Sequence, residues 1–227
     1  MAQDYQVIWT AEPADREGTP LIVLLHGYGA NERDLLSLVP GLPAEATYAA
    51  VRAPVALGYG AYTWFDLDVE RLAYSSAAAR QAVEDLAGWI DHVRTPHSSV
   101  SLLGFSMGMA MATSLLRSRP ADFTACVGLS GFAVDPSRGD GLHGYFDDEA
   151  LAARQVPFFW GRDQHDPIIP AEHIDYTHRW ATDTVDLTKV LYTGAGHGIV
   201  PEEVAHVNEF LTAKVIDSSP PQPKTSR

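Results

Sequence analysis

Short apolar runs alternate with helical patterns along almost the whole chain, and this alternation limits its possible folds more than any other feature. Seven runs have the length and the β-branched or apolar character of buried strands: residues 7–10, 21–25, 47–51, 99–103, 124–129, 156–160 and 188–192. The clearest helical pattern covers residues 76–93, where apolar side chains recur every three or four positions. Strands that alternate with helices usually pair in parallel. The sequence therefore predicts an α/β fold with a doubly wound, mostly parallel sheet and helices on both faces.

Further helices are predicted where the same periodicity returns, at residues 32–38, 107–117, 171–182 and 202–214. Pro170 and Pro201 stand where the last two should begin. A chain of 227 residues, 46% of them hydrophobic, suits one α/β domain, which we assign to residues 1–216 with no large cap domain. We expect residues 135–145 to form a surface loop and residues 217–227 to form a disordered tail.

The composition favours an acidic cytoplasmic protein that acts on small molecules. A net charge of −13 disfavours binding to nucleic acid and to anionic membranes. The N-terminus has no signal-peptide pattern and the chain has no run of 18 apolar residues, so stable membrane insertion is not expected. The only cysteine, Cys126, lies in an apolar run and is expected to be a buried structural thiol. A homodimer is compatible with all of this.

The pentapeptide Gly104-Phe-Ser-Met-Gly108 lies between a predicted strand and a predicted helix. Gly-x-Ser-x-Gly in that context is typical of a nucleophile elbow, in which a sharp turn exposes a serine at the carboxyl end of a sheet. The flanking glycines let the strand and the helix approach each other closely. Ser106 is therefore the predicted nucleophile.

A serine hydroxyl needs a base to take its proton, and the base needs a carboxylate to fix its tautomer. Asp166 and His197 each follow a predicted strand, in the chain order Ser, Asp, His that this fold uses. Asp163 competes with Asp166 because both lie on one loop. Asp166 is favoured since Pro167 rigidifies its position, whereas Asp163 could equally cap the turn.

The other histidines are interpreted as surface or structural residues. Most of them fall within or near predicted helices, and His173 and His178 are five residues apart, which places them off a common helical face. No metal site and no organic cofactor are therefore expected.

Negative charge that develops on a carbonyl oxygen needs backbone N–H donors. The strand at residues 21–25 ends in the glycine-rich loop His26-Gly-Tyr-Gly29, so we expect the N–H groups of Tyr28 and Met107 to form an oxyanion hole. The aromatic segment that contains Trp64 and Phe65 either borders a substrate pocket or packs a long loop on the core. Weaker candidates for the pocket are Phe132, Ile168 and Ile169.

These motifs resemble the phospholipase/carboxylesterase family of α/β-hydrolases, which includes bacterial carboxylesterases and acyl-protein thioesterases. The resemblance extends from residue 21 to residue 211. It rests on His26-Gly-Tyr-Gly29, Trp64-Phe-Asp66, Gly104-Phe-Ser-Met-Gly108, Leu129-Ser-Gly131, Asp166-Pro-Ile-Ile-Pro170 and Gly196-His-Gly198. It implies the same triad, the same oxyanion donors, and a substrate that lies beside Trp64 and Phe65.

The expected activity is that of a serine carboxylesterase that hydrolyses small to medium esters through an acyl-enzyme. The thioesterase branch usually has Gln after the serine, whereas this chain has Met107, which favours simple esters. One alternative is an acyl-protein thioesterase or lysophospholipase that uses the same machinery. Another, from a different class, is a ligand-binding protein on a hydrolase scaffold.

Overall fold

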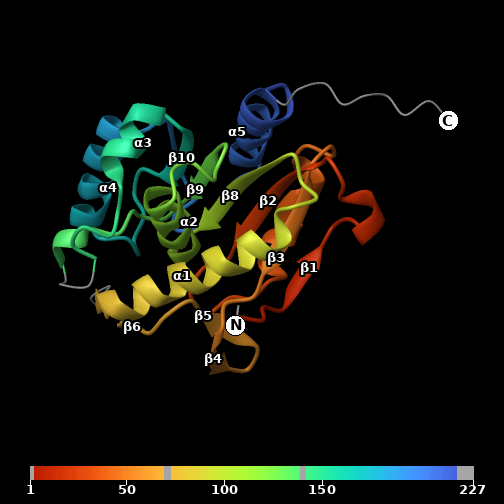
Figure 1. Cartoon of the computed structure of the whole chain (residues 1–227). Coiled ribbons are helices and arrows are strands. Elements are labelled where there is room, and N and C mark those ends of the chain that lie inside the picture. The colour runs from red at the N-terminus through yellow and green to blue at the C-terminus, as the bar shows by residue number, and fades with distance from the viewer. Residues whose placement is uncertain (1–2, 69–72, 139–141, 219–227) are drawn as a thin grey trace.

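A computed structural model describes residues 3–68, 73–138 and 142–218 (Figure 1). The strands are β1 (Val7–Trp9), β2 (Pro20–Leu25), β3 (Thr47–Val51), β4 (Val55–Gly58), β5 (Ala61–Thr63), β6 (Leu67–Asp68), β7 (Ala73–Tyr74), β8 (Ser99–Phe105), β9 (Cys126–Leu129), β10 (Pro157–Asp163) and β11 (Asp186–Tyr192). The α-helices are α1 (Ser76–Val93), α2 (Met107–Ser118), α3 (Asp148–Arg154), α4 (Ala171–Thr184) and α5 (Pro201–Leu211). Shorter turns are the 3-10 helices η1 (Pro13–Asp15), η2 (Asp34–Gly41) and η3 (Pro136–Arg138) and the π-helix η4 (Thr212–Ile216).

The main sheet has seven strands in the order β1-β3-β2-β8-β9-β10-β11. The edge strand β1 runs antiparallel to β3, and every other neighbouring pair is parallel. Each of the seven strands predicted from the sequence is present in this sheet. Parallel strands place their carboxyl ends at one edge, so the loops after β2, β8, β10 and β11 meet there.

Apolar side chains alternate between the two faces of the sheet. On β2, Leu21 and Val23 belong to the core layer that contains the buried residues of α1, α2, α3 and α4. Ile22 and Leu24 point into the second layer, which is closed by η2 and α5. Figure 1 shows α1 to α4 together on one side of the strands and α5 on the other. The predicted arrangement with helices on both faces is confirmed.

Some predicted elements differ from the structure. Residues 32–38 were expected to form an α-helix, but a 3-10 helix starts at Asp34, because the side chains of Asn31 and Asp34 bond to nearby backbone N–H groups. The last predicted helix, 202–214, ends as α5 at Leu211 and continues as the π-helix η4. Helix α3 was missed, although Asp147 caps it by accepting the N–H of Ala150. The predicted disordered tail, 217–227, lies outside the described residues except for its first two.

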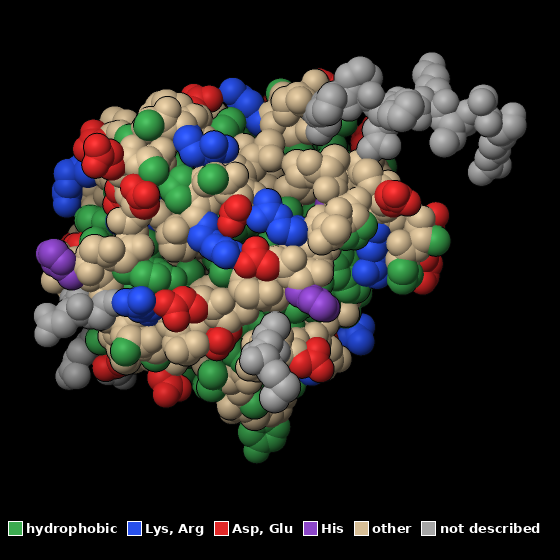
Figure 2. Space-filling view, in the orientation of Figure 1, with side chains coloured by type: hydrophobic (Ala, Val, Ile, Leu, Met, Phe, Trp, Pro, Cys, Tyr) green, Lys and Arg blue, Asp and Glu red, His purple; other side chains and the backbone are tan. Residues whose placement is uncertain are grey.

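The aromatic segment before α1 begins with a β-hairpin rather than an irregular loop. Strands β4 and β5 are joined by Tyr59 and Gly60, whose φ angles of 52° and 80° give the left-handed two-residue turn that hairpins favour. All of β4 is exposed, and Tyr59 is fully so. In Figure 1 the hairpin projects at the lower end of the molecule, where Figure 2 shows hydrophobic side chains at the surface. Elsewhere on that face, acidic and basic side chains are intermixed.

Helix α2 packs directly on β2 and β8, and two glycines make this possible. A Cβ atom on Gly104 would collide with the backbone of Gly108, and one on Gly108 would collide with the carbonyl of Leu25. Only glycine fits at these two positions, because the backbone of α2 lies directly against the backbones of β2 and β8 there. Among the described residues, no helix is long and apolar enough to cross a membrane.

Replacing Gly108 by Ala should lower the free energy of unfolding by about 3 kcal/mol, because the added methyl group must displace the backbone of β2. Gly88 is the matched control, since it lies in α1 with open space around its Cβ position. Gly88→Ala should raise stability by about 0.5–1 kcal/mol through helix propensity. Urea denaturation of both variants measures the difference. Equal stability of the Gly108→Ala variant and the wild type would contradict the close packing.

Candidate active site

Ser106 occupies a strained turn between β8 and α2. Its backbone has φ 54° and ψ −117°, a conformation that residues with a side chain rarely adopt. Its N–H donates to the carbonyl of Leu129, and its own carbonyl accepts the N–H groups of Met109 and Ala110. The turn is thus fixed by β9 on one side and by the first turn of α2 on the other, with the hydroxyl at the carboxyl edge of the sheet.

Three side chains form a continuous hydrogen-bond chain at this edge. His197 Nε2 lies 2.9 Å from Ser106 Oγ, and His197 Nδ1 lies 2.9 Å from Asp166 Oδ2. A carboxylate accepts hydrogen bonds, so Nδ1 carries the proton and Nε2 is free to accept one from the serine. The Asp166 side chain is fully buried, whereas that of His197 is 18% exposed. The structure therefore brings together the serine, acid and base that the sequence analysis selected.

The second oxygen of Asp166 is also occupied. Oδ1 accepts the N–H of Ile168 at 2.8 Å and that of Ile169 at 3.2 Å, so the tight turn after Pro167 holds the carboxylate in place. The rival acid, Asp163, points to backbone instead of to His197. It accepts the N–H of His165, as expected for a residue that caps the turn, and those of Ala195 and Gly196.

The loop that follows β2 is braced from behind by His26, a role that the sequence analysis missed. His26 Nε2 accepts the N–H of Ala53 at 3.0 Å, and its Nδ1 lies 2.8 Å from the Gly27 carbonyl, which assigns the ring proton to Nδ1. Burial lowers the pKa of His26, so the ring is neutral. The only sequence signal was its place directly before Gly27 at a strand end. The loop it braces carries Tyr28, whose N–H has no hydrogen-bond partner among the described residues.

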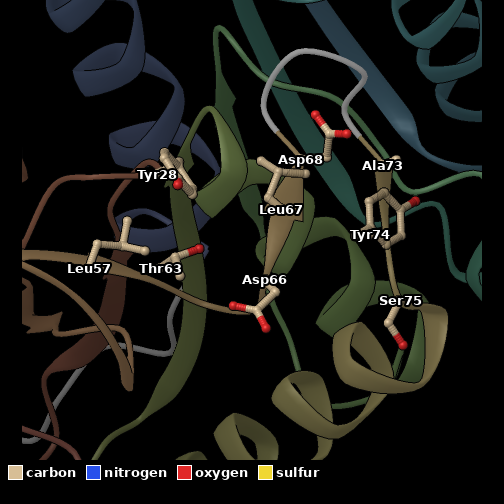
Figure 3. Close-up of a pocket in the computed structure, with 9 residues that line it drawn as sticks. All are labelled: Tyr28, Leu57, Thr63, Asp66, Leu67, Asp68, Ala73, Tyr74 and Ser75. Carbon is tan, nitrogen blue, oxygen red and sulfur yellow. The ribbon is translucent and has the colours of Figure 1, made fainter.

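A cavity of about 500 Å³ is lined by Tyr28, on the loop after β2, and by residues of the segment that precedes α1 (Figure 3). Its lining includes Tyr28 from the braced loop and Thr63, whose hydroxyl oxygen lies 3.2 Å from the sulfur of Met107. It therefore adjoins the loop after β2, and Thr63 connects its wall to Met107, the residue that follows Ser106. The described residues that line it are Tyr28, Leu57, Thr63, Asp66, Leu67, Asp68, Ala73, Tyr74 and Ser75. Apolar, hydroxyl and carboxylate side chains all face this space.

Comparison with known proteins decides the family. The sequence profile of the Phospholipase/Carboxylesterase family matches residues 7–215. The chain belongs to this family. The protein MhqD of Bacillus subtilis (strain 168) is 26% identical over 203 residues, which cover 86% of this chain and 94% of that protein.

Solved structures agree with the fold of this family. A carboxylesterase from Mesorhizobium loti superposes with a TM-score of 0.75 at 18% identity, covering 92% of this chain and 93% of that one. Acyl-protein thioesterase 2 from Zea mays gives a TM-score of 0.73 at 21% identity, covering 92% of this chain and 98% of that one. At these identities the likeness shows a common α/β-hydrolase fold.

In this phospholipase/carboxylesterase family member, the predicted pocket residues are not among the described residues that line the cavity of Figure 3. Trp64 is 1% exposed, and its indole N–H donates to the carbonyl of His26 at 2.9 Å. Phe65 is buried in the large core layer, and Phe132 and Ile169 in a smaller cluster. Ile168 is 54% exposed beside Asp166. The packing interpretation of the aromatic segment therefore describes Trp64 and Phe65.

Of the remaining histidines, His173 and His206 pack against aromatic side chains, and His92, His143, His165 and His178 are exposed. His173 is buried with its ring edge against Phe132, and His206 lies 2.9 Å from the hydroxyl of Tyr192. No cluster of three or more His, Cys, Asp or Glu side chains within the described parts of the chain is placed to hold a metal ion.

Glu203 is the unusual titratable residue near the site. It is the third residue of α5, it is fully buried, and neither carboxyl oxygen makes a hydrogen bond of normal geometry within the described residues. Its carboxyl group lies against Gly161 of β10, where a Cβ atom would collide with it. Burial raises the pKa of Glu203 from 4.5 to about 7, and the N–H of Val200 opposes the shift.

This shift makes stability depend on pH. The folded protein keeps the Glu203 proton up to about pH 7, whereas the unfolded chain loses it near pH 4.5, so wild-type stability falls as the pH rises through that window. Glu203→Gln should remove the dependence. The free energy of unfolding of the variant minus that of the wild type should be about 3 kcal/mol larger at pH 8 than at pH 4. Denaturant titrations at both pH values measure it, with the exposed neighbour Glu202→Gln as control. A pH-independent difference would contradict the shifted pKa.

Proposed function

We propose that this family member is a serine carboxylesterase that cleaves small to medium carboxylic esters through an acyl-enzyme. The observation that supports this proposal best is the unbroken hydrogen-bond chain from Ser106 through His197 to Asp166, at distances of 2.9 Å. Nucleophilic acyl transfer needs a buried carboxylate, an imidazole with its proton on Nδ1, and a hydroxyl on a strained turn.

In the first half of the reaction, Ser106 Oγ attacks the carbonyl carbon of the ester while His197 Nε2 takes the hydroxyl proton. Asp166 stabilises the resulting imidazolium through Nδ1. The tetrahedral intermediate then collapses, its bond to the alcohol oxygen breaks, and His197 returns the proton to that oxygen. The alcohol leaves, and the acyl group remains esterified to Ser106.

In the second half, a water molecule takes the place of the alcohol. His197 removes its proton as the water oxygen attacks the acyl carbon, and the bond to Ser106 Oγ breaks. The proton passes back to Ser106, and the carboxylic acid is released. Both halves pass through an oxyanion.

We assign the oxyanion hole to the backbone N–H groups of Tyr28 and Met107. Met107 is the first residue of α2, so its N–H has no acceptor within the helix and lies at the positive end of the helix dipole. Tyr28 follows Gly27, whose Cβ position would lie 3.4 Å from Ser106 Cβ. The two donors therefore flank the serine. Such donors supply the largest single stabilisation in many acyl-transfer enzymes.

Ser106→Ala should reduce kcat for a p-nitrophenyl ester by about 10⁴-fold or more while leaving thermal stability near that of wild type, because covalent catalysis is lost and the fold is not. An organophosphonate should label the wild type at Ser106 and leave the variant unlabelled. The exposed Ser37→Ala variant is the control. Turnover by the Ser106→Ala variant at the wild-type rate would overturn the assignment.

The cavity carries information about the substrate. One of its lining side chains, Asp66, is an exposed carboxylate, and the protein has a net charge of −13. Like charges repel at short range. We infer that neutral acyl or alcohol groups are preferred over anionic ones.

Kinetics with a matched ester pair test this preference. An ester of butyric acid should be cleaved with a kcat/KM about 10-fold above that of the corresponding monoester of succinic acid, a difference of about 1.4 kcal/mol. Asp66→Asn should narrow the ratio by raising kcat/KM for the anionic ester only. Glu149→Gln on α3, also exposed, controls for net charge. If Asp66→Asn leaves the ratio of the two kcat/KM values unchanged, the acyl group binds outside this cavity.

A further inference from the structure

The loop that carries His197 is held on both sides of the histidine by buried polar groups. On the far side, the hydroxyl of Ser130 donates to the carbonyl of Gly198 at 3.1 Å. On the near side, the carboxylate of Asp163 accepts the N–H groups of Ala195 and Gly196. Gly196, which takes part in the second contact, directly precedes His197 in the chain.

Asp163 joins this loop to the loop that bears the acid. One of its oxygens, Oδ2, accepts from Ala195 at 2.6 Å and from Gly196 at 3.0 Å. The other, Oδ1, accepts the N–H of His165 at 2.7 Å, which is adjacent to Asp166. A single carboxylate therefore bridges the residues that immediately precede Asp166 and His197 in the chain.

The bridge is rigid and charged. Asp163 is the last residue of β10 and is 2% exposed. Hydrogen bonds from His165, Gly196 and Ala195 lower the pKa of its carboxyl group, so it stays ionised. Gly194 and Gly196 have φ angles of 87° and 59°, a left-handed backbone that turns successive N–H groups toward one oxygen. Without an anion there, those partly buried N–H groups would lose their acceptor.

We propose that Asp163 is a positioning residue of this hydrolase, whose carboxylate fixes the 194–197 loop against the acid loop and thereby holds His197 between Ser106 and Asp166. The proposal rests on the proposed function. Asp163 bonds only to backbone N–H groups in the described structure and does not touch the reacting atoms. Its effect acts through His197, since a displacement of about 1 Å at a catalytic group can cost about 100-fold in rate.

Asp163→Asn tests the bridge with almost no change of shape. The amide keeps one acceptor oxygen but replaces the other with an NH₂ group, so either His165 or the pair Ala195 and Gly196 loses its acceptor. Asp186→Asn is the control, because Asp186 begins β11, is exposed, and pairs with Lys214 at 3.0 Å. The control therefore makes the same Asp-to-Asn change on β11, the strand that leads into the loop carrying His197.

The kinetic experiment counts active sites by organophosphonate titration run to completion, and then measures kcat and KM per titrated site. For Asp163→Asn we expect kcat to fall about 10- to 100-fold with KM within about 3-fold of wild type, and Asp186→Asn to match wild type. A lower melting temperature with full kcat per titrated site would overturn the proposal, because Asp163 would then serve stability alone.

A second readout does not depend on turnover. The proton between His197 Nδ1 and Asp166 should give a downfield ¹H NMR signal, which we expect to broaden or vanish in Asp163→Asn and to persist in Asp186→Asn. An unchanged signal together with unchanged kcat overturns the positioning role while the esterase assignment stands. A lost signal in a protein whose wild type cleaves no ester would support positioning and refute the proposed function.

Discussion

The backbone contact between α2 and the strands β2 and β8 is the constraint on which the candidate site depends. Because Gly108 lies against the Leu25 carbonyl and Gly104 lies against Gly108, α2 begins almost without a gap at the end of β8. Only a sharp turn can connect them, and Ser106 accordingly has a positive φ of 54°. The backbone strain in this turn is offset by the burial of α2 side chains, such as Met109 and Leu115, against the sheet.

The same closeness determines where the other groups must come from. With α2 pressed on β2, the loop after β2 passes next to Ser106, and the loops after β10 and β11 are the neighbours on the other side. Buried polar groups position these loops. His26 braces the first loop, and Asp163 and Asp166 brace the other two, each through backbone N–H groups.

Much of this was predictable from the sequence because it depends on local patterns. The seven strands follow from apolar runs, and the site residues from their position directly after strands. The hairpin β4–β5 was missed because Tyr59 in a left-handed turn has no reliable sequence signal. The burial of Trp64 and the bridging role of Asp163 depend on contacts with His26 and with residues 195–196, which are distant in the sequence. Nothing local distinguishes an aspartate that caps its own turn from one that also binds a second loop.

Buried polar groups around the site differ in how many hydrogen bonds they make. Groups with several hydrogen bonds hold the loops in place, whereas a group without them lowers the stability of the fold. Asp163 and Asp166 accept several hydrogen bonds each, so their burial fixes geometry without leaving a charge unpaired. Glu203, behind β10, makes no hydrogen bond of normal geometry with its carboxyl group within the described residues, and it keeps its proton up to about pH 7 instead. A neutral carboxyl group packed on Gly161 imposes no direction on the loop beyond it. The orientation of the candidate catalytic groups therefore depends on the carboxylates that accept hydrogen bonds. The pH dependence of stability depends on Glu203, whose carboxyl group lacks them.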